Sequence, residues 1–411
     1  MSKNLRWLLA VLLAFGLIAA ACGDDDDADA GDDGDAAGDD AGDDGDAAGD
    51  DGDDMADDGD DMADVADDGD DGDDMADDGD DVDPLIATFD ADGDGTVRIG
   101  VAAAGPRDDN GYYQSLVDFA EDFSAENGFE APIVRDLIGA EEAAVAMSDL
   151  AQQGVDIMFV GASEIAEPLA DLTEQFPDIF WYCNCGAGFT ELPGLAQATD
   201  WGAAIHYTAG VAMGQVMVEL GTTQSVFLGC CDLNFEQEAY NATVFGMQSV
   251  DPGLTMEYVS TGDFPFDFDN SANATQALTT AIADGAGLAY AYLGGAMEPV
   301  GQAATDEGIA VFAASSADIC ERDDGIAWTG SIVFDGGLYA AEALRQIVAG
   351  ELGEGETYQF PTQQGLNGAL VCDASAETAD AVAGAFGLLA SFDGDLMGAL
   401  GGISGEAYAG G

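Results

Sequence analysis

The chain has 411 residues with 83 acidic and 7 basic side chains, so its formal net charge at pH 7 is −76. This excess of negative charge excludes nucleic acid and anionic membrane surfaces as partners sought by electrostatic attraction. With one histidine, no lysine beyond Lys3 and no phosphate-binding glycine loop, the sequence shows no catalytic pattern. We therefore expect neither an enzyme nor a cofactor.

Residues 1–22 have the pattern of a bacterial lipoprotein signal. Lys3 and Arg6 form a positive start, and residues 8–18 are an apolar stretch too short to cross a bilayer comfortably. The following Ala-Ala-Ala-Cys22 resembles the lipobox read by lipoprotein signal peptidase. We expect a signal peptide over residues 1–21 and acyl chains such as palmitate on Cys22, anchoring the protein on the extracytoplasmic face of the cell membrane. An ordinary secretory signal or an uncleaved anchor helix are the alternatives.

Residues 22–95 read as a linker. Nearly half of the acidic residues lie between Asp24 and Asp94, in a run of aspartates interrupted by Gly, Ala and Met. Such a run buries little apolar area and repels itself, which predicts a disordered, extended tether. Weak uptake of calcium by the clustered carboxylates is the alternative to a plain spacer.

Asp90-Ala-Asp92-Gly-Asp94-Gly95 matches the first half of a calcium-binding loop. The twelfth loop position, however, is Val101 where a glutamate is required, and Arg98 lies inside the loop. The residues that follow also read as a strand. We therefore predict no metal site here.

From Thr96 onward, short apolar runs alternate with helical patterns, which is typical of βαβ units and parallel sheets. The expected strands are Val97–Ala103, Ile133–Leu137, Val155–Val160, Ile179–Tyr182, Ser225–Leu228, Thr255–Ser260, Leu288–Tyr292, Ala310–Ala314 and Ala327–Ile332. The expected helices include Tyr113–Asn127, Glu141–Gln153, Ala203–Leu220, Gln237–Gln248 and Gly336–Ala349.

This folded part is too long for one core of this type, so we expect an α/β protein with two Rossmann-like lobes. The change in pattern at Leu195–Trp201 indicates a first crossing between them. The predicted division gives residues 96–200 to lobe 1, 201–318 to lobe 2 and 319–350 again to lobe 1. Residues 351–411 then complete lobe 2 and end in a helical segment.

The segment from Arg98 to Ser115, Arg-Ile-Gly-Val-Ala-Ala-Ala-Gly-Pro-Arg-Asp-Asp-Asn-Gly-Tyr-Tyr-Gln-Ser, resembles the opening of the basic membrane protein (BMP) family. These are solute-binding lipoproteins of ABC transporters, typified by purine nucleoside receptors. Residues 154–161, the glycines of the helix over 202–214, residues 225–229 and the Gly294-Gly295 turn follow in the family's order. The resemblance covers about residues 96–372. A more distant type I periplasmic binding protein, for a sugar or an amino acid, is the alternative.

The resemblance implies two lobes joined by a hinge, with a nucleoside or similar flat polar solute held between them and delivered to an ABC permease and its ATPase. Asp109 takes the place of the family's loop aspartate. Tyr112 takes that of the phenylalanine that stacks on a nucleobase, and Phe264 offers an opposing ring. Tyr113 replaces the family's asparagine, and Phe334 stands where the family has a lysine. The strand ending near Ser316 lacks the aspartate that follows it in the family.

Ligands of open α/β sheets lie beyond the carboxyl ends of the strands. Together with the resemblance, that rule gives these candidate ligand-binding residues: Asp109, Tyr112, Tyr113, Gln114, Ser163, Trp201, Phe235, Phe264, Gly294 and Ser316. Several of these residues have plainer interpretations. Asp109 can cap the following helix, the two tyrosines can fasten that helix to the sheet, and Trp201 can pack at the hinge. His206, inside a predicted helix, reads as structural.

Six cysteines remain after Cys22, namely Cys183, Cys185, Cys230, Cys231, Cys320 and Cys372. In an exported domain they suit three disulfides, with fifteen possible pairings. Cys185 with Cys320, and Cys372 with one of the adjacent pair, are the pairings suggested by the predicted strand ends. A zinc site is less favoured, because a Cys-x-Cys pair and a Cys-Cys pair without a suitable histidine do not have the usual spacing of zinc ligands.

The sequence leaves open whether closing of the lobes serves transport or signalling. Both uses employ the same hinge motion, and a sensor would pass it to a membrane receptor instead of a permease.

The folded part has more than forty acidic residues against five arginines, which implies strong self-repulsion. Salt screens such repulsion, so we expect the melting temperature to be higher in molar sodium chloride than in dilute buffer. Thermal unfolding followed over a salt series measures this. A melting temperature that stays level or falls as salt is added would contradict it.

Overall fold

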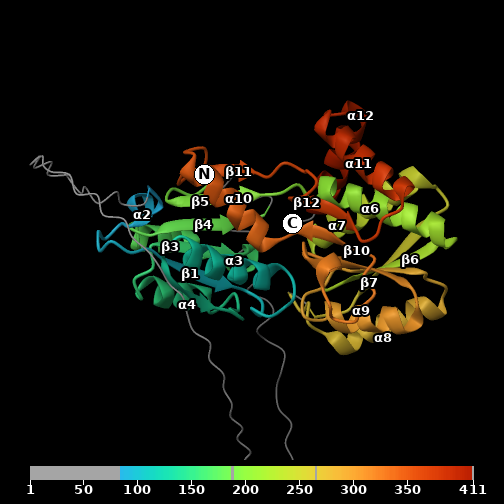
Figure 1. Cartoon of the computed structure of the whole chain (residues 1–411), viewed down its shortest axis with the longest axis horizontal. Helices are drawn as coiled ribbons and strands as arrows, with labels where there is room; N and C mark the ends of the chain where they lie inside the picture. Colours follow the sequence, from blue (N-terminus) through green and yellow to red (C-terminus); the bar gives the residue numbers. More distant parts are fainter. Residues whose placement is uncertain (1–83, 187–188, 264–265, 410–411) are drawn as a thin grey trace, which may run out of the picture. The chain divides into compact units, whose positions relative to one another are not determined.

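Short apolar runs build two separate six-stranded sheets (Figure 1). The computed structural model describes residues 84–186, 189–263 and 266–409. The first sheet consists of β1 (Arg98–Ala103), β2 (Glu130–Arg135), β3 (Ile157–Gly161), β4 (Phe180–Asn184), β5 (Leu195–Thr199) and β11 (Thr357–Gln359). Its order is β11-β5-β4-β3-β1-β2, and all its neighbouring strands run parallel.

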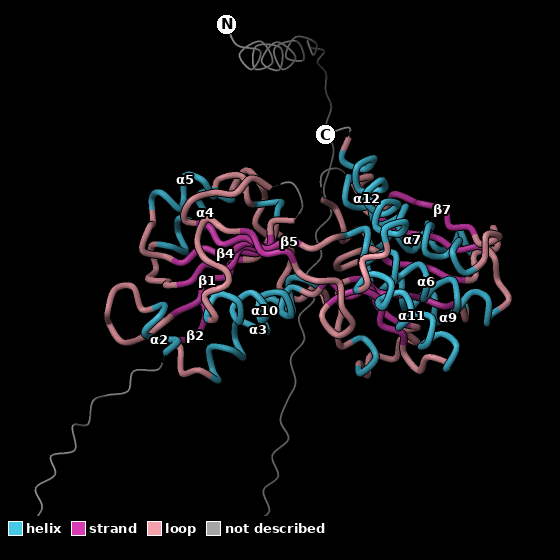
Figure 2. Tube along the Cα trace, turned by 90° about the horizontal axis from the view of Figure 1, so that it is seen from above, coloured by secondary structure: helices cyan, strands magenta, loops and turns pink. Residues whose placement is uncertain are grey.

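Helices cover both faces of the first sheet, because successive residues of a strand point to opposite sides. Ile99 and Val101 pack under α3 (Tyr112–Glu126) and α10 (Gly336–Val348). Ala102 faces the other way, toward α4 (Ala143–Ala151) and α5 (Leu169–Gln175). Figure 2 shows these two helix pairs on opposite sides of the strands. The short 3-10 helix η2 (Ser163–Ile165) follows β3.

The second sheet has the same plan. It consists of β6 (Gln224–Gly229), β7 (Thr255–Ser260), β8 (Leu288–Ala291), β9 (Ala310–Ala314), β10 (Gly330–Phe334) and β12 (Asn367–Val371), in the order β12-β10-β9-β8-β6-β7. Only the pairing of β12 with β10 is antiparallel. The predicted class of two Rossmann-like lobes with largely parallel sheets is confirmed.

Five long helices flank the second sheet, and a sixth packs on two of them. One face carries α6 (Gly202–Leu220), α7 (Asn234–Val250) and α11 (Ala376–Ala390), and the other carries α8 (Ser271–Ala283) and α9 (Met297–Glu307). The last helix, α12 (Gly394–Tyr408), lies against α6 and α7 (Figure 1). None of the helices in the described ranges is long and apolar enough to cross a membrane.

The chain crosses between the lobes three times, and two predicted boundaries need correction. It crosses after β5, again after β10, and a third time between β11 and β12. Residues 319–334 stay in lobe 2 because β10 pairs with β9 there, so lobe 1 resumes at α10 and not at residue 319. Residues 357–359 belong to lobe 1, since β11 pairs with β5.

The predicted linker is too long at its C-terminal end. Residues 84–95, expected to be disordered, begin with the short helix α2 (Pro84–Phe89), which packs on lobe 1. The ring of Phe89 is only 3% exposed and lies edge-on to that of Phe180, with 5.6 Å between centroids. Burial of these apolar side chains holds the segment in place. The remainder of the linker, the signal peptide and Cys22 lie outside the described residues.

The six cysteines form the disulfides Cys183–Cys185, Cys230–Cys231 and Cys320–Cys372. Both suggested pairings are therefore wrong. Cys183 and Cys185 lie together at the end of β4 in lobe 1, whereas Cys320 lies in the 3-10 helix η3 (Ile319–Glu321) of lobe 2. Cys372 directly follows β12, and its amide donates to the Thr329 carbonyl just before β10, which brings it close to η3.

Helices α6 and α7 approach closely where Gly210 and Gly246 face each other. A Cβ on Gly246 would collide with the carbonyl oxygen of Tyr207 and lie 2.9 Å from Cα of Gly210. We expect Gly246→Ala to lower the free energy of unfolding by about 1–3 kcal/mol, the usual cost of overpacking. Urea denaturation measures it.

Gly387→Ala in α11 is the matched control. A Cβ there meets no atom within 4 Å, so the better helix propensity of alanine should stabilise the protein by up to about 1 kcal/mol. If the two substitutions change the free energy of unfolding equally, Gly246 is not required for the close packing of α6 on α7.

Candidate functional site

The carboxyl ends of the strands in both sheets border one cleft of about 1030 Å³. In lobe 1 lining residues lie at or beyond the ends of β1, β2, β3, β4 and β5, and in lobe 2 at or beyond the ends of β6, β7, β8, β9 and β10. Loops at this edge are free to vary without disturbing the sheet, which is why binding sites of α/β proteins occur here. The cleft is therefore the candidate ligand site.

Six of the ten predicted ligand residues line the cleft, namely Asp109, Tyr112, Tyr113, Ser163, Phe235 and Gly294. Phe264 lies outside the described residues. The remaining three are among the described residues but do not line the cleft.

Those three have other contacts. The indole Nε1 of Trp201 donates to Ser404 Oγ of α12 at 3.0 Å, so the ring packs at the first crossing as its plainer interpretation anticipated. The side-chain oxygen Oε1 of Gln114 accepts from the backbone amide of Asn110. The hydroxyl of Ser316 donates to the Asn110 carbonyl at 2.9 Å, which joins lobe 2 to lobe 1.

Asp109 fastens the start of α3. Its Oδ1 accepts from the backbone amides of Gly111 at 2.9 Å and Gln114 at 3.0 Å, and the residue is 4% exposed. Burial raises the pKa of this carboxyl, against the backbone hydrogen bonds, and the charge of Asp269 in lobe 2 adds to the rise. Asp109 is therefore both the cap of the helix and part of the cleft wall.

Tyr112 and Tyr113 form the wall of lobe 1, with their rings edge to face and 5.4 Å between centroids. The Tyr113 hydroxyl donates to Oε1 of Glu164 at 3.3 Å, and Nδ2 of Asn184 donates to the Tyr112 hydroxyl at 3.0 Å. Both Oε2 of Glu164 and Oδ1 of Asn184 are buried without a hydrogen-bond partner among the described residues. This wall therefore has two acceptors that the protein leaves unpaired.

The wall of lobe 2 is largely aromatic. Phe235 stacks near Phe268 with 6.4 Å between centroids, and Tyr292 stacks on Phe334 at 5.5 Å. Of these four rings only Phe235 was predicted from the sequence to bind ligand, although Tyr292 directly follows β8 and Phe334 ends β10; Phe268 lies in the loop between β7 and α8. Flat apolar walls with a few polar groups are what a pocket for a small organic molecule requires.

His206 of α6 is held by two hydrogen bonds in this wall. Its Nδ1 donates to the Gly202 carbonyl at 2.8 Å, and its Nε2 accepts from the Tyr290 hydroxyl at 3.1 Å. Burial lowers its pKa to about 4, so the imidazole is neutral at pH 7. The histidine thus brings no positive charge to the cleft, and its contacts agree with the structural interpretation.

The charge of the cleft is entirely acidic among the lining residues that the structure describes. They include eight carboxylic side chains and no lysine or arginine. The eight are Asp109, Glu164, Asp200, Asp232, Glu238, Asp263, Asp267 and Asp269. Both lobes contribute, so a bound molecule would meet negative charge on two sides.

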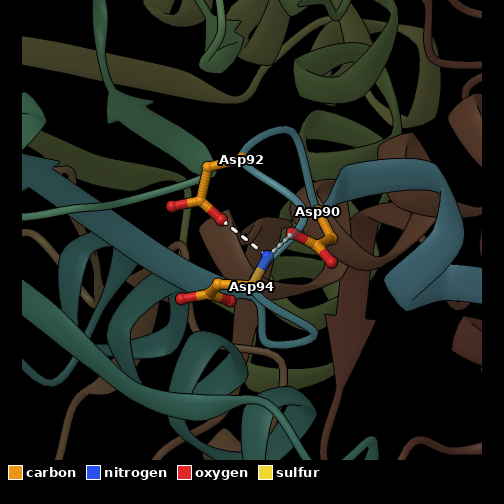
Figure 3. Close-up of side chains that lie close together, drawn as sticks. All are labelled: Asp90, Asp92 and Asp94. Atoms are coloured by element: carbon orange, nitrogen blue, oxygen red, sulfur yellow. Dashed lines mark hydrogen bonds between the residues drawn. The ribbon is translucent and has the colours of Figure 1, made fainter.

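Asp90, Asp92 and Asp94 also come together, with ligand atoms within 4.8 Å of one another (Figure 3). Oδ1 of Asp90, however, accepts from the amides of Gly93 at 2.7 Å and Asp94 at 3.1 Å, which accounts for the turn. Val101, the twelfth loop position, is buried in β1. None of the three aspartates lines the cleft.

No family model matches the chain, and no curated protein matches its sequence. Among solved structures, an ABC transporter solute-binding protein from Conexibacter woesei DSM 14684 superposes with a TM-score of 0.57 at 19% identity, over 72% of this chain and 97% of its own. Another from Aeropyrum pernix K1 gives 0.55 at 12% identity, over 76% and 92%. The chain has the two-lobed fold of type I periplasmic binding proteins.

The fold alone does not assign a role. A transcriptional activator of the comK gene from Bacillus halodurans superposes equally well, with a TM-score of 0.55 at 15% identity over 71% of this chain and 96% of its own. The role of the two-lobed protein must therefore be argued from its own cleft and its own N-terminus.

Asp200 lies at the first crossing and makes part of the cleft wall. Burial raises its pKa to about 6, with a further contribution from the Glu238 charge, although the Tyr339 hydroxyl donates to its Oδ2 at 2.9 Å. The unfolded carboxyl titrates near 3.8. The contribution of Asp200 to the free energy of unfolding is therefore fully present below pH 3.8. It is lost as the pH rises through about 6.

Asp200→Asn removes the charge and keeps an acceptor for Tyr339. We expect it to raise the free energy of unfolding at pH 7.5 by about 1–3 kcal/mol, and with it the melting temperature. At pH 4 both quantities should change little. The exposed Asp122→Asn in α3 is the control and should change neither value. A shift of equal size at both pH values would mean that ionisation of Asp200 is not the cause.

Proposed function

We propose that the protein is a solute receptor on the outside of the cell, which captures a small organic molecule between its lobes and delivers it to an ABC permease and ATPase. The observation that carries this is the cleft itself. It gathers the carboxyl ends of strands from both sheets and has aromatic walls in each lobe. Three chain crossings join the lobes, which suits hinge closure around a ligand.

The lipobox-like sequence before Cys22 supports a lipid anchor for this receptor, with the acidic segment as its tether. An anchored receptor stays near the permease that receives its solute. The resemblance of residues 98–115 supports membership of the BMP family, and flat solutes such as nucleosides are the first class to test. Non-enzymatic capture agrees with a cleft whose only histidine is neutral and already hydrogen-bonded.

The aromatic wall provides the test. Phe266 lines the cleft and is 38% exposed, so truncating it removes contact area for a ligand at little cost to packing. Mass spectrometry of the full chain should find a small molecule that co-purifies, and thermal-shift assays with nucleosides, sugars and amines should find solutes that raise the melting temperature. We expect Phe266→Ala to weaken their binding at least tenfold.

Phe392→Ala is the matched control, because this ring is 76% exposed and does not line the cleft. It should leave binding unchanged. If no solute co-purifies and none in the panel binds, or if both substitutions act alike, capture in the cleft is wrong.

A further inference from the structure

The cleft combines negative charge on both sides with no positive charge among its described lining residues. Lobe 1 contributes Asp109, Glu164 and Asp200, and lobe 2 contributes the other five carboxylic side chains. A site built for an anionic solute would place donors or cations here, as arginine does for carboxylates and phosphates. An anionic ligand is therefore excluded by repulsion.

Charge across the cleft adds to the effect of burial on two of these carboxylates. Burial raises the pKa of Asp109 and of Asp200, and the charges of Asp269 and Glu238, respectively, raise these pKa values further. Each pair joins one lobe to the other, so bringing the lobes together increases the repulsion. A cation between them would convert this repulsion into attraction.

Most of the acidic oxygens are already engaged with the protein. Asp109 caps α3, Asp269 Oδ1 accepts from the Gly295 amide at 2.6 Å, and Glu238 Oε1 accepts from Ser404 Oγ. Glu164 differs from these carboxylates because its Oε2 is buried without a hydrogen-bond partner among the described residues, while its Oε1 accepts from the Tyr113 hydroxyl. It is therefore the carboxylate best placed to bind a ligand directly.

The unpaired oxygen of Glu164 has a neighbour of the same kind. Asn184 uses its Nδ2 on the Tyr112 hydroxyl and leaves its Oδ1 without a donor. The two tyrosines that hold these side chains are in ring contact, so both acceptors belong to one wall. Leaving a buried acceptor unpaired is costly, and a ligand carrying N–H groups would recover that cost.

The aromatic rings favour the same chemistry. A cation near the face of a tyrosine or phenylalanine ring is attracted by the ring's quadrupole. Tyr112 and Tyr113 provide such rings in lobe 1, and Phe235, Phe268 and Tyr292 provide them in lobe 2. These rings offer contact area to a flat or alkyl body whose charged end is directed to the two acceptors.

Building on the function proposed above, we propose that the captured solute is an organic cation with N–H donors, an amine or amidine, whose charged end binds Glu164 Oε2 and Asn184 Oδ1. This assigns Glu164 and Asn184 as specificity-determining residues. It also predicts that adding a positive charge to a neutral solute of the same shape increases its affinity.

Matched probes test this by calorimetric titration of the full chain. The pairs are 2-phenylethylamine with 2-phenylethanol, tryptamine with tryptophol, and benzamidine with benzamide, and adenosine serves as a flat neutral solute. In at least one pair we expect the cation to bind at least tenfold more tightly than its neutral partner. Phenylacetate should not bind.

Glu164→Gln should weaken the binding of the cation at least tenfold and reduce its advantage over the neutral partner. Because this substitution removes a buried, half-paired charge, it should not lower the melting temperature. Glu174→Gln removes the same charge from the exposed face of α5 and should leave the affinity unchanged. Equal losses in the two variants would indicate general attraction by a negative protein and would overturn the assignment.

If none of the cations binds, or if the neutral partners bind more tightly, the proposal of a cationic ligand is wrong. If a neutral solute such as adenosine then binds and is lost in Phe266→Ala, the receptor function stands without it. If no solute binds at all, both proposals fall.

Discussion

The start of α10 packs directly on the start of α3, and this contact positions the cleft wall of lobe 1. A Cβ on Gly336 would collide with the Tyr112 carbonyl oxygen, and the amide of Gly337 donates to Ser115 Oγ at 3.1 Å. Only glycine allows two backbones to approach so closely. Because α10 begins directly after β10 of lobe 2, the same contact joins the second crossing of the chain to the tyrosines of the cleft.

The acidic cleft opposes the stability that the two cores provide. Burial raises the pKa of Asp109, Glu164, Asp200 and Glu238, so each is more easily ionised in the unfolded chain than in the folded one. No arginine lines the described part of the cleft to offset this. Such groups are expected at a binding site, where residues that bind a ligand often lower the stability of the unliganded protein.

Much of the fold follows from local pattern. β7 and β9 have the predicted bounds because continuous or alternating apolar residues end in clear turns. β5, β11 and β12 were not predicted. β11 has three residues and no buried one, and β12 owes its place to antiparallel pairing with β10, which is distant along the chain. Edge strands of this kind depend on tertiary contacts more than on their own sequence.

The site was predictable only in position. The rule that ligands bind at strand ends predicted that Asp109, Tyr112 and Phe235 lie together, and they line the cleft because topology alone brings those ends together. It did not single out Glu164, next to the predicted Ser163, or Asn184, between two cysteines. Whether a polar atom at a strand end stays unpaired depends on which side chains of other loops reach it. The role of Ser316, which donates to the opposite lobe, likewise required the folded structure.

The charge of the whole chain then has two separable effects on a cationic solute. At low ionic strength the net charge of −76 draws cations toward the protein over long distances, and the acidic segment before the domain competes for them. At about 0.1 M salt the screening length is about 10 Å, so this attraction is largely lost. Contacts within the cleft are shorter and partly shielded from solvent, and therefore persist. Selectivity must accordingly come from Glu164, Asn184 and the aromatic walls, whereas the surface charge affects mainly how fast a solute arrives.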